Sequence, residues 1–251
     1  MIHVTPHARR ALRLPWRALL ANKAREFGVK LRGGRIKGQG MIGAPATTVA
    51  AGFKALRADD FVQYNLPQAW VERRQIPIAI HGRIPRQHAV VLDLGCGPGT
   101  STEVLCYFAD PTWTVLGYDL TDHYIERAAA RSGRGEFRNH AGQRISPRFA
   151  CQDISQPLAS PDGGLVAGGS VDYALSAGVV GLYMNEESAA RLASELARVV
   201  KPGGFVALDA GPAVPVRALK RILIARGFRY LHRARSFWIE PRPKLVFQRI
   251  A

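Results

Sequence analysis

The sequence predicts an α/β fold. We expect a doubly wound, mostly parallel seven-stranded sheet with an antiparallel C-terminal edge hairpin, preceded by an N-terminal helical extension. From residue 88 onward, short apolar runs alternate with helical patterns, and this alternation indicates βαβ units with helices on both faces of a sheet. Only a short connection separates the last two apolar runs, which is typical of an antiparallel pair. The 251 residues suffice for one large domain with an appendage.

Each element follows from its own pattern of apolar residues. Strands are expected at residues 89–94, 114–119, 148–151, 171–176, 205–209, 228–233 and 244–248. Helices are expected at residues 100–108, 123–131, 187–200 and 216–226. The glycine-rich stretches 133–144 and 159–170 indicate loops.

The chain divides into three zones by composition. Residues 1–43 form a basic arm, residues 44–86 contain short helical patterns with a break near Pro67, and residues 87–251 carry the alternating pattern. We expect the middle zone to act as a helical lid or cap over the cleft of the third. Within it, Phe61, Tyr64 and Trp70 have roughly helical spacing and are candidates for either a pocket wall or core packing.

Positive charge is concentrated near the N-terminus. The net charge is +16, and residues 1–57 hold twelve Lys or Arg against the single acid Glu26. This arm fits three alternatives: a solvated tail, a segment that binds RNA phosphates, or a helix that lies on an anionic membrane surface. In the membrane alternative, the inserted residues are Leu12, Leu14, Trp16, Leu19 and Leu20.

Several classes of protein are disfavoured. No apolar run reaches the ~18 residues of a membrane-spanning helix, and no signal-peptide pattern is present. The three cysteines, Cys96, Cys106 and Cys151, show no Cys-x-x-Cys spacing, so neither a disulfide framework nor a metal site is expected. These features predict a cytoplasmic protein, with peripheral attachment to a membrane left open by the arm.

A glycine-rich loop follows the first strand of the third zone. Asp93, Gly95, Gly97 and Gly99 alternate with other residues, and ligands of an open parallel sheet bind beyond the carboxyl ends of its strands. A dinucleotide fingerprint would need glycine where Thr100 stands, and no Gly-Lys-Ser/Thr of a phosphate loop follows. The loop therefore indicates a ligand other than a dinucleotide or a nucleoside triphosphate.

The segment "LDLGCGPGT" resembles motif I of the class I S-adenosylmethionine-dependent methyltransferases. Four further segments resemble the family in the same order, over roughly 160 residues: "VLGYDLT", "FACQDIS", "VDYALSAGVVGLY" and "ELARVVKPGGFVALD". The resemblance implies a Rossmann-like methyltransferase fold, S-adenosylmethionine as cofactor and methyl transfer as the activity.

The resemblance also implies cofactor contacts. Asp119 would accept both ribose hydroxyls, Asp153 would accept from the adenine amine, and Leu120 and Ile154 would pack beside the adenine. Simpler roles are a brace for Asp93, a helix cap for Asp119 and a loop acid for Asp153. The full set of implied cofactor residues is Asp93, Gly95, Cys96, Gly97, Gly99, Thr100, Asp119, Leu120, Asp153, Ile154, Ser176, Ala177 and Tyr64.

The sequence does not identify a catalytic base or the acceptor. The weak candidates for a catalytic residue are Tyr183, Asp209 and His123, and methyl transfer by proximity alone is the alternative. No Asn-Pro-Pro-Tyr stretch appears, which disfavours methyltransferases that act on bases or amide nitrogens. We expect a small-molecule or lipid-like acceptor methylated at oxygen or nitrogen. The alternatives are an RNA methyltransferase anchored by the basic arm and a non-catalytic binding or assembly protein; the oligomeric state is left open.

Overall fold

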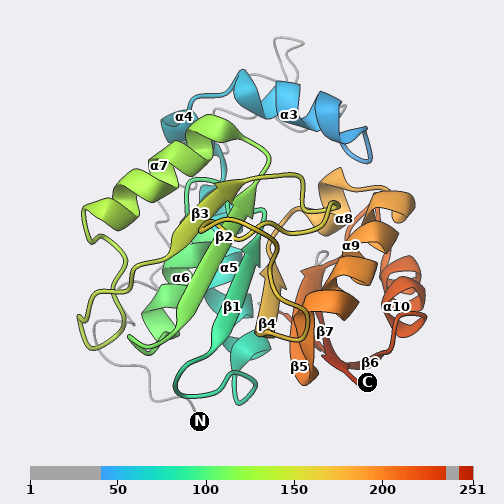
Figure 1. Ribbon diagram of the computed structural model, residues 1–251. Coiled ribbons are helices and arrows are strands. Elements are labelled where there is room, and N and C mark those ends of the chain that lie inside the picture. The colour runs from blue at the N-terminus through green and yellow to red at the C-terminus, as the bar shows by residue number, and fades with distance from the viewer. Residues whose placement is uncertain (1–40, 236–242, 251) are drawn as a thin grey trace.

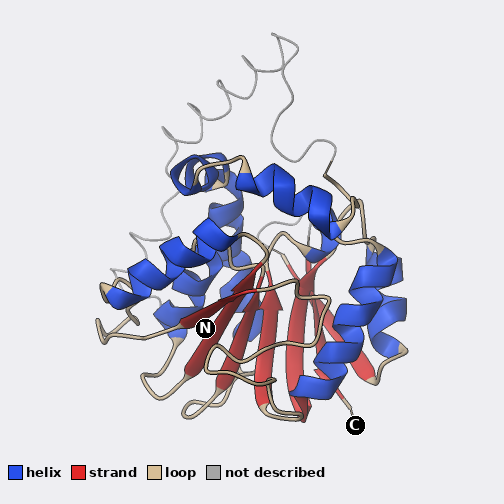
Figure 2. Ribbon diagram, turned by 45° about the horizontal axis from the view of Figure 1, so that its top comes forward, coloured by secondary structure: helices blue, strands red, loops and turns tan. Residues whose placement is uncertain are grey.

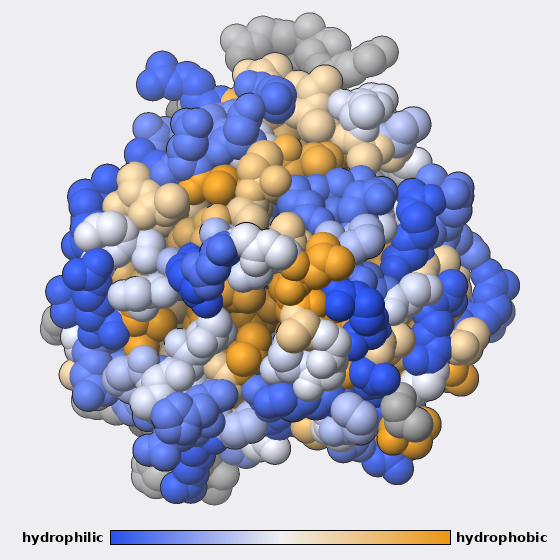
Figure 3. Space-filling view, in the orientation of Figure 1, coloured by the Kyte–Doolittle hydropathy of each residue, from blue (hydrophilic) through white to orange (hydrophobic). Residues whose placement is uncertain are grey.

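The structure is a computed structural model that describes residues 41–235 and 243–250. Predictions about residues 1–40, including the basic arm and Trp16, lie outside the described residues. Among those that are described, no helix is long and apolar enough to cross a membrane. In a space-filling view, apolar residues gather in the middle of one face and hydrophilic residues surround them (Figure 3).

A seven-stranded sheet forms the centre of the molecule, with the order β3-β2-β1-β4-β5-β7-β6 (Figure 1). Six strands run parallel, and β7 is antiparallel to both of its neighbours, β5 and β6. This arrangement confirms the predicted fold class. The strands are β1 Val90–Leu94, β2 Thr114–Asp119, β3 Arg148–Cys151, β4 Val171–Ser176, β5 Val200–Asp209, β6 Phe228–Ala234 and β7 Lys244–Arg249.

Helices cover both faces of the sheet (Figure 2). One core cluster joins the sheet to α5 and α6, and a second joins it to α9 and α10. The helix α7 packs along β2 and β3. The helices after the glycine loop are α6 Thr100–Phe108, α7 Asp122–Gly133, α8 Val180–Tyr183, α9 Glu186–Val199 and α10 Val216–Ile224.

The middle zone forms three helices with different surroundings. These are α3 Ala46–Lys54, α4 Ala58–Tyr64 and α5 Leu66–Ile80. The helix α3 lies above the carboxyl ends of the strands (Figure 1), whereas α5 buries Ile76, Ala79 and Ile80 against the sheet. The part of the expected lid that covers the cleft is therefore α3 with α4, and α5 belongs to the layer on the sheet.

Two local features differ from the sequence-based expectation. The helix α8 was not expected, and β5 begins at Val200, five residues before the expected 205. Val200 pairs with Val171 and Phe205 pairs with Tyr173, so the register shifts and residues 201–204 form an irregularity in the β4–β5 ladder. A bulge accommodates the glycines of "KPGG" while the backbone stays in the ladder.

Candidate active site

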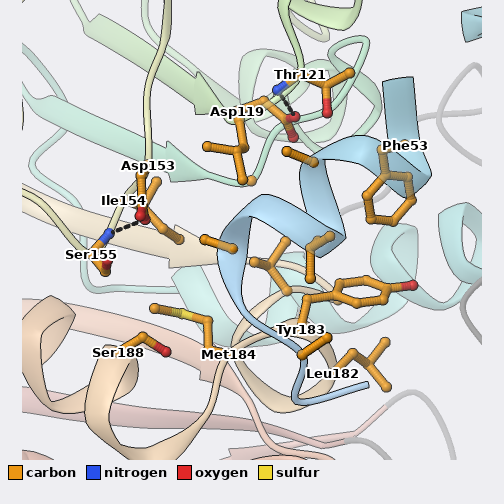
Figure 4. A pocket seen from close by; sticks show the side chains of 18 of the residues that line it. Phe53, Asp119, Thr121, Asp153, Ile154, Ser155, Leu182, Tyr183, Met184 and Ser188 are labelled. Atoms are coloured by element: carbon orange, nitrogen blue, oxygen red, sulfur yellow. Dashed lines mark hydrogen bonds between the residues drawn. The ribbon is translucent and has the colours of Figure 1, made fainter. Parts of the chain in front are cut away.

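A cavity of about 490 Å³ lies at the carboxyl ends of the strands, beneath α3. Its size falls in the roughly 300–1,000 Å³ range of small-molecule pockets. Asp119, Asp153 and Ser155 lie on one side of it, and Leu182 and Tyr183 lie on the opposite side (Figure 4). The cavity therefore has a strand-end half, formed by Gly95, Asp119, Leu120, Asp153 and Ile154, and a lid half, formed by Val49, Phe53, Phe61, Leu182 and Tyr183.

Two carboxylates dominate the strand-end half. Asp119, the last residue of β2, accepts from Gly97 N and from Thr121 N, both at 2.9 Å. Burial raises the pKa of Asp119, and these backbone hydrogen bonds oppose the rise. Asp153 follows β3 and accepts from Ser155 N at 2.8 Å. Because each carboxylate oxygen offers two lone pairs, Asp153 can still accept hydrogen bonds from a ligand, whereas Asp119 can do so in exchange for its contacts with Thr121 and Leu120.

Gly95 brings backbone directly to the cavity. Its φ of +82° lies in the left-handed region, and a Cβ built there would stand 2.1 Å from Cγ2 of Val179. Any side chain would therefore displace the opposite wall. Gly95 N and Cys96 N both donate to Tyr118 O, at 2.7 and 2.9 Å, so the loop is held against the end of β2.

Asp93 lies behind the glycine loop and does not line the cavity. It is fully buried. Its carboxylate accepts from Ser101 Oγ at 2.8 and 3.0 Å and from Thr102 Oγ1 at 2.6 Å. Burial raises the pKa of Asp93 to about 6, against the lowering effect of these two hydroxyl groups. The contacts seen for Asp93 are those of a brace between β1 and the start of α6.

The lid half is made of aromatic and aliphatic side chains. Phe53 packs edge-on against Tyr183 and Phe61, with ring centroids 5.1 and 5.9 Å apart. Phe61 also approaches the glycine loop, since one of its ring carbons lies 3.3 Å from where a Cβ of Gly97 would stand. Such edge-to-face pairs stabilise the cluster beyond the burial of their area.

The turn between α3 and α4 is fastened to α7. Tyr124 Oη donates to Leu56 O at 3.1 Å, and a ring nitrogen of His123 lies 3.0 Å from the same oxygen. Ion pairs join Lys54 to Asp122 at 3.0 Å and Arg127 to Asp59 at 2.9 Å. All four charged side chains are substantially exposed, so each pair contributes little to stability.

The structure brings about half of the predicted site residues to the cavity. Gly95, Asp119, Leu120, Asp153, Ile154, Ala177 and the candidate Tyr183 line it. The remaining described residues of the prediction are not among those that line the cavity, namely Asp93, Cys96, Gly97, Gly99, Thr100, Ser176, Asp209 and His123. The side chain of Tyr64 is outside the described residues. Asp209 binds backbone N–H groups of the loop after β4, and His123 contacts the α3–α4 turn.

Sequence reasoning missed a larger group of lining residues. They come from α3, the start of α5, the start of α7, the loop after β3, and the segment from α8 into α9. Helical spacing of the aromatic residues pointed to Phe61, but no motif marks Phe53 or Val49. The missed residues include Val49, Phe53, Asn65, Gln68, Thr121, Tyr124, Gln152, Ser155, Val179, Leu182, Met184, Ser188 and Arg191.

Residues 91–204 match a family described as "Methyltransferase domain". This match begins in β1, ends in β5 and includes the glycine loop and both strand-end carboxylates. The chain contains a class I S-adenosylmethionine-dependent methyltransferase domain. A curated relative, the probable methyltransferase ltbC of Aspergillus luteorubrus, is 29% identical over 117 residues, 47% of this chain and 38% of the relative. The alignment thus spans little more than a third of that relative's length.

Solved structures share the fold of the methyltransferase domain. Magnesium protoporphyrin IX methyltransferase from Synechocystis PCC 6803, with bound S-adenosylhomocysteine, superposes with a TM-score of 0.60 and 16% identity, over 81% of this chain and 99% of that one. A TehB-like S-adenosylmethionine-dependent methyltransferase from Corynebacterium glutamicum superposes with a TM-score of 0.52 and 17% identity, over 94% of this chain and 99% of that one. At these identities the likeness concerns the fold.

The cofactor of the methyltransferase domain is S-adenosylmethionine, and the cavity suits it chemically. The adenosine part offers hydroxyl and amine donors, and the strand-end half offers the acceptors Asp119 and Asp153 beside apolar Leu120 and Ile154. The bare backbone at Gly95 leaves room that a Cβ would take. The donors, acceptors and shape of this half therefore fit the cofactor.

Proposed function

We propose that the protein transfers a methyl group from S-adenosylmethionine to a small, largely apolar acceptor, at oxygen or nitrogen. One observation carries the proposal: a single cavity joins the strand-end carboxylates to the apolar lid half. A covered cavity of this kind suits a molecule that enters whole rather than a nucleic-acid strand. The neighbouring Synechocystis structure, named for a methyltransferase of magnesium protoporphyrin IX, supports a small-molecule acceptor.

In this proposal, the strand-end half holds the cofactor. Asp119 accepts the ribose hydroxyls, Asp153 accepts the adenine amine, and Ile154 packs beside the ring. When bound, the cofactor supplies a methyl group on a positively charged sulfur. Gly95 and the segment 177–179 confine the opposite end of the ligand, and the aromatic lid residues exclude water. The work of the chain is chiefly to bring the two reactants together.

The lid half suits an acceptor that needs no strong base. Its lining residues Val49, Phe53, Phe61 and Leu182 are apolar, and Tyr183 contributes the one hydroxyl group among the five residues that define it. The carboxylates Asp119 and Asp153 belong to the strand-end half. We therefore infer that catalysis rests on proximity and on the exclusion of water, with an oxygen that is already ionised, as in a phenolate, or an unprotonated nitrogen as the accepting atom.

Thermal denaturation tests the proposal. S-adenosylhomocysteine at 100 times its dissociation constant is expected to stabilise the protein by about 2.7 kcal/mol, whereas NADH at the same concentration is expected to have no effect. A shift with NADH and none with S-adenosylhomocysteine would contradict the proposal. Incubation with methyl-labelled cofactor and a small-molecule extract, followed by mass spectrometry, then identifies the acceptor. Label recovered in RNA would favour the RNA alternative.

A further inference from the structure

A cluster of buried charged side chains lies between the strand ends and α5, behind the cavity wall. It consists of Glu72, Asp93, Asp209 and Lys244, which are 5%, 0%, 3% and 0% exposed. In a strand, alternate residues share one face. Asp93, Asp209 and Lys244 each lie two positions from a residue in the core beneath α5, namely Val91, Ala207 and Val246. Three strands therefore direct charged groups toward the helix that carries Glu72.

Lys244 reaches from β7 to the end of β4. It pairs with Asp209 across the antiparallel β5–β7 ladder, and its Nζ donates to Ser176 O at 3.1 Å. Ser176 is the last residue of β4, and the next three residues, 177–179, line the cavity. A fully buried ammonium group thus holds the carbonyl group from which this part of the wall begins.

Asp209 binds other polar groups of the same segment, residues 176–181. It accepts from Ser176 Oγ at 3.1 Å, from Val179 N at 3.2 Å and from Gly181 N at 2.9 Å. The backbones also touch, since a Cβ on Gly181 would stand 2.3 Å from the carbonyl carbon of Ala210. Residues 176–181 are therefore fastened to the ends of β5 and β7 by hydrogen bonds and by close packing.

Glu72 on α5 lies within electrostatic reach of Lys244. Burial raises the pKa of Glu72 to about 7, while the charge of Lys244 and a hydrogen bond with Gln68 oppose the rise. Gln68 lies one helical turn earlier, lines the cavity and comes within 3.3 Å of where a Cβ of Gly178 would stand. A buried lysine without an opposite charge nearby would be costly, and Lys244 acts electrostatically on both Glu72 and Asp93.

We propose that Lys244 is a positioning residue for the cofactor, acting through the main chain of the 177–179 wall. The inference rests on the proposed function and adds to it a residue at the start of β7, outside the matched segment 91–204. Lys244 does not line the cavity. Its effect is to keep the wall opposite Gly95 at a fixed distance, so that the ligand meets a preorganised surface.

Three variants separate positioning from a purely structural role. Lys244→Met removes the anchor and takes the positive charge away from the buried carboxyl groups of Glu72, Asp93 and Asp209, so the melting temperature is expected to fall. The double variant Glu72→Gln with Lys244→Met also removes one of the buried carboxyl groups and is expected to regain part of that loss, because fewer buried charges are then left without an opposite charge. Lys201→Met is the matched control, since Lys201 forms a 2.8 Å ion pair with Asp172 that lies outside the cavity.

Two measurements need no acceptor. In titration calorimetry, the double variant is expected to bind S-adenosylhomocysteine about tenfold more weakly than the unaltered protein, because preorganisation of the wall is lost. In hydrogen exchange without ligand, the amides of Val179 and Gly181 are expected to exchange faster in the double variant than in Lys201→Met. If the double variant shows unaltered affinity and unaltered exchange, the role proposed for Lys244 is overturned and the proposed function is not affected. Failure of the unaltered protein to bind S-adenosylhomocysteine would overturn the proposed function itself, whatever the exchange rates show.

Discussion

The two halves of the cavity are built in different ways. Residues of the strand-end half lie at the ends of β1, β2 and β3 or within three residues of them, and backbone hydrogen bonds hold the glycine loop and the carboxylate of Asp119. Residues of the lid half come from α3, α4 and α8, and their side chains hold one another mainly by aromatic packing. The half proposed for the cofactor thus depends on the backbone, whereas the half proposed for the acceptor depends on side chains that can be replaced without changing the backbone.

This difference also predicts where the molecule opens. The strand ends belong to the buried sheet, but α3 is tied to α7 by the exposed Lys54–Asp122 pair and by the His123 and Tyr124 contacts with Leu56 O. Exposed ion pairs contribute about 0–1 kcal/mol each. Local opening is therefore expected at α3 and α4 rather than at the glycine loop, which gives ligands a route to the cavity.

Gly95→Ala is expected to have the largest effect, because it changes backbone in the half that depends on it. The new methyl group would stand 2.1 Å from Val179 Cγ2 on a residue with φ of +82°. Overpacking and the left-handed conformation together predict a loss of about 2–5 kcal/mol in the free energy of unfolding, measured by denaturant titration. Gly133→Ala is the control, since nothing lies within 4 Å of its Cβ position. Equal stability of Gly95→Ala and Gly133→Ala would contradict the dependence of the strand-end half on its backbone.

Asp119→Ala tests the same half through one side chain. The loss of a charged acceptor for two hydroxyl groups should weaken binding of S-adenosylhomocysteine by about 1.5–3 kcal/mol, roughly ten- to a hundredfold. Titration calorimetry measures this directly. The control is Asp110→Ala, which removes a carboxylate that accepts a hydrogen bond from Thr112 near the opposite end of β2. It should leave the affinity unchanged. If Asp119→Ala also leaves it unchanged, the ribose lies elsewhere.

Phe53→Ala should have the smallest of these effects on the cofactor, because it alters the lid half alone. Loss of the buried ring and of its edge-on contacts with Tyr183 and Phe61 is expected to lower the free energy of lid opening by about 3–5 kcal/mol, seen as faster amide exchange in α3. Binding of S-adenosylhomocysteine should change by less than about twofold, since such ring pairs contribute little outside their own cluster. Val62→Ala removes an exposed side chain of α4 and is the control. A large loss of cofactor affinity in Phe53→Ala would show that the halves are not independent.

The difference between the strand-end half and the lid half also explains which site residues can be predicted from the sequence. Strands β2, β3 and β4 lie where the apolar runs place them, and the strand-end carboxylates follow from motif spacing. Phe53 and Val49 were missed because packing between distant helices leaves no local pattern. Lys244 was missed for another reason. A lysine at the start of an apolar strand is typical of an exposed strand end. Only the sheet order places Lys244 between β5 and β6, on the side of Glu72.

The position of β7 inside the sheet also constrains how the chain is assembled during synthesis. Strand β6 pairs with β7 and, among the described strands, with no other. It leaves the ribosome first, yet it cannot join the sheet until β7 has been made and has paired with β5. A nascent chain that reaches residue 235 already carries every motif of the methyltransferase domain, but β5 is still an open edge that invites pairing with another chain. Completion of the last strand therefore both closes that edge and delivers Lys244 to the wall of the site.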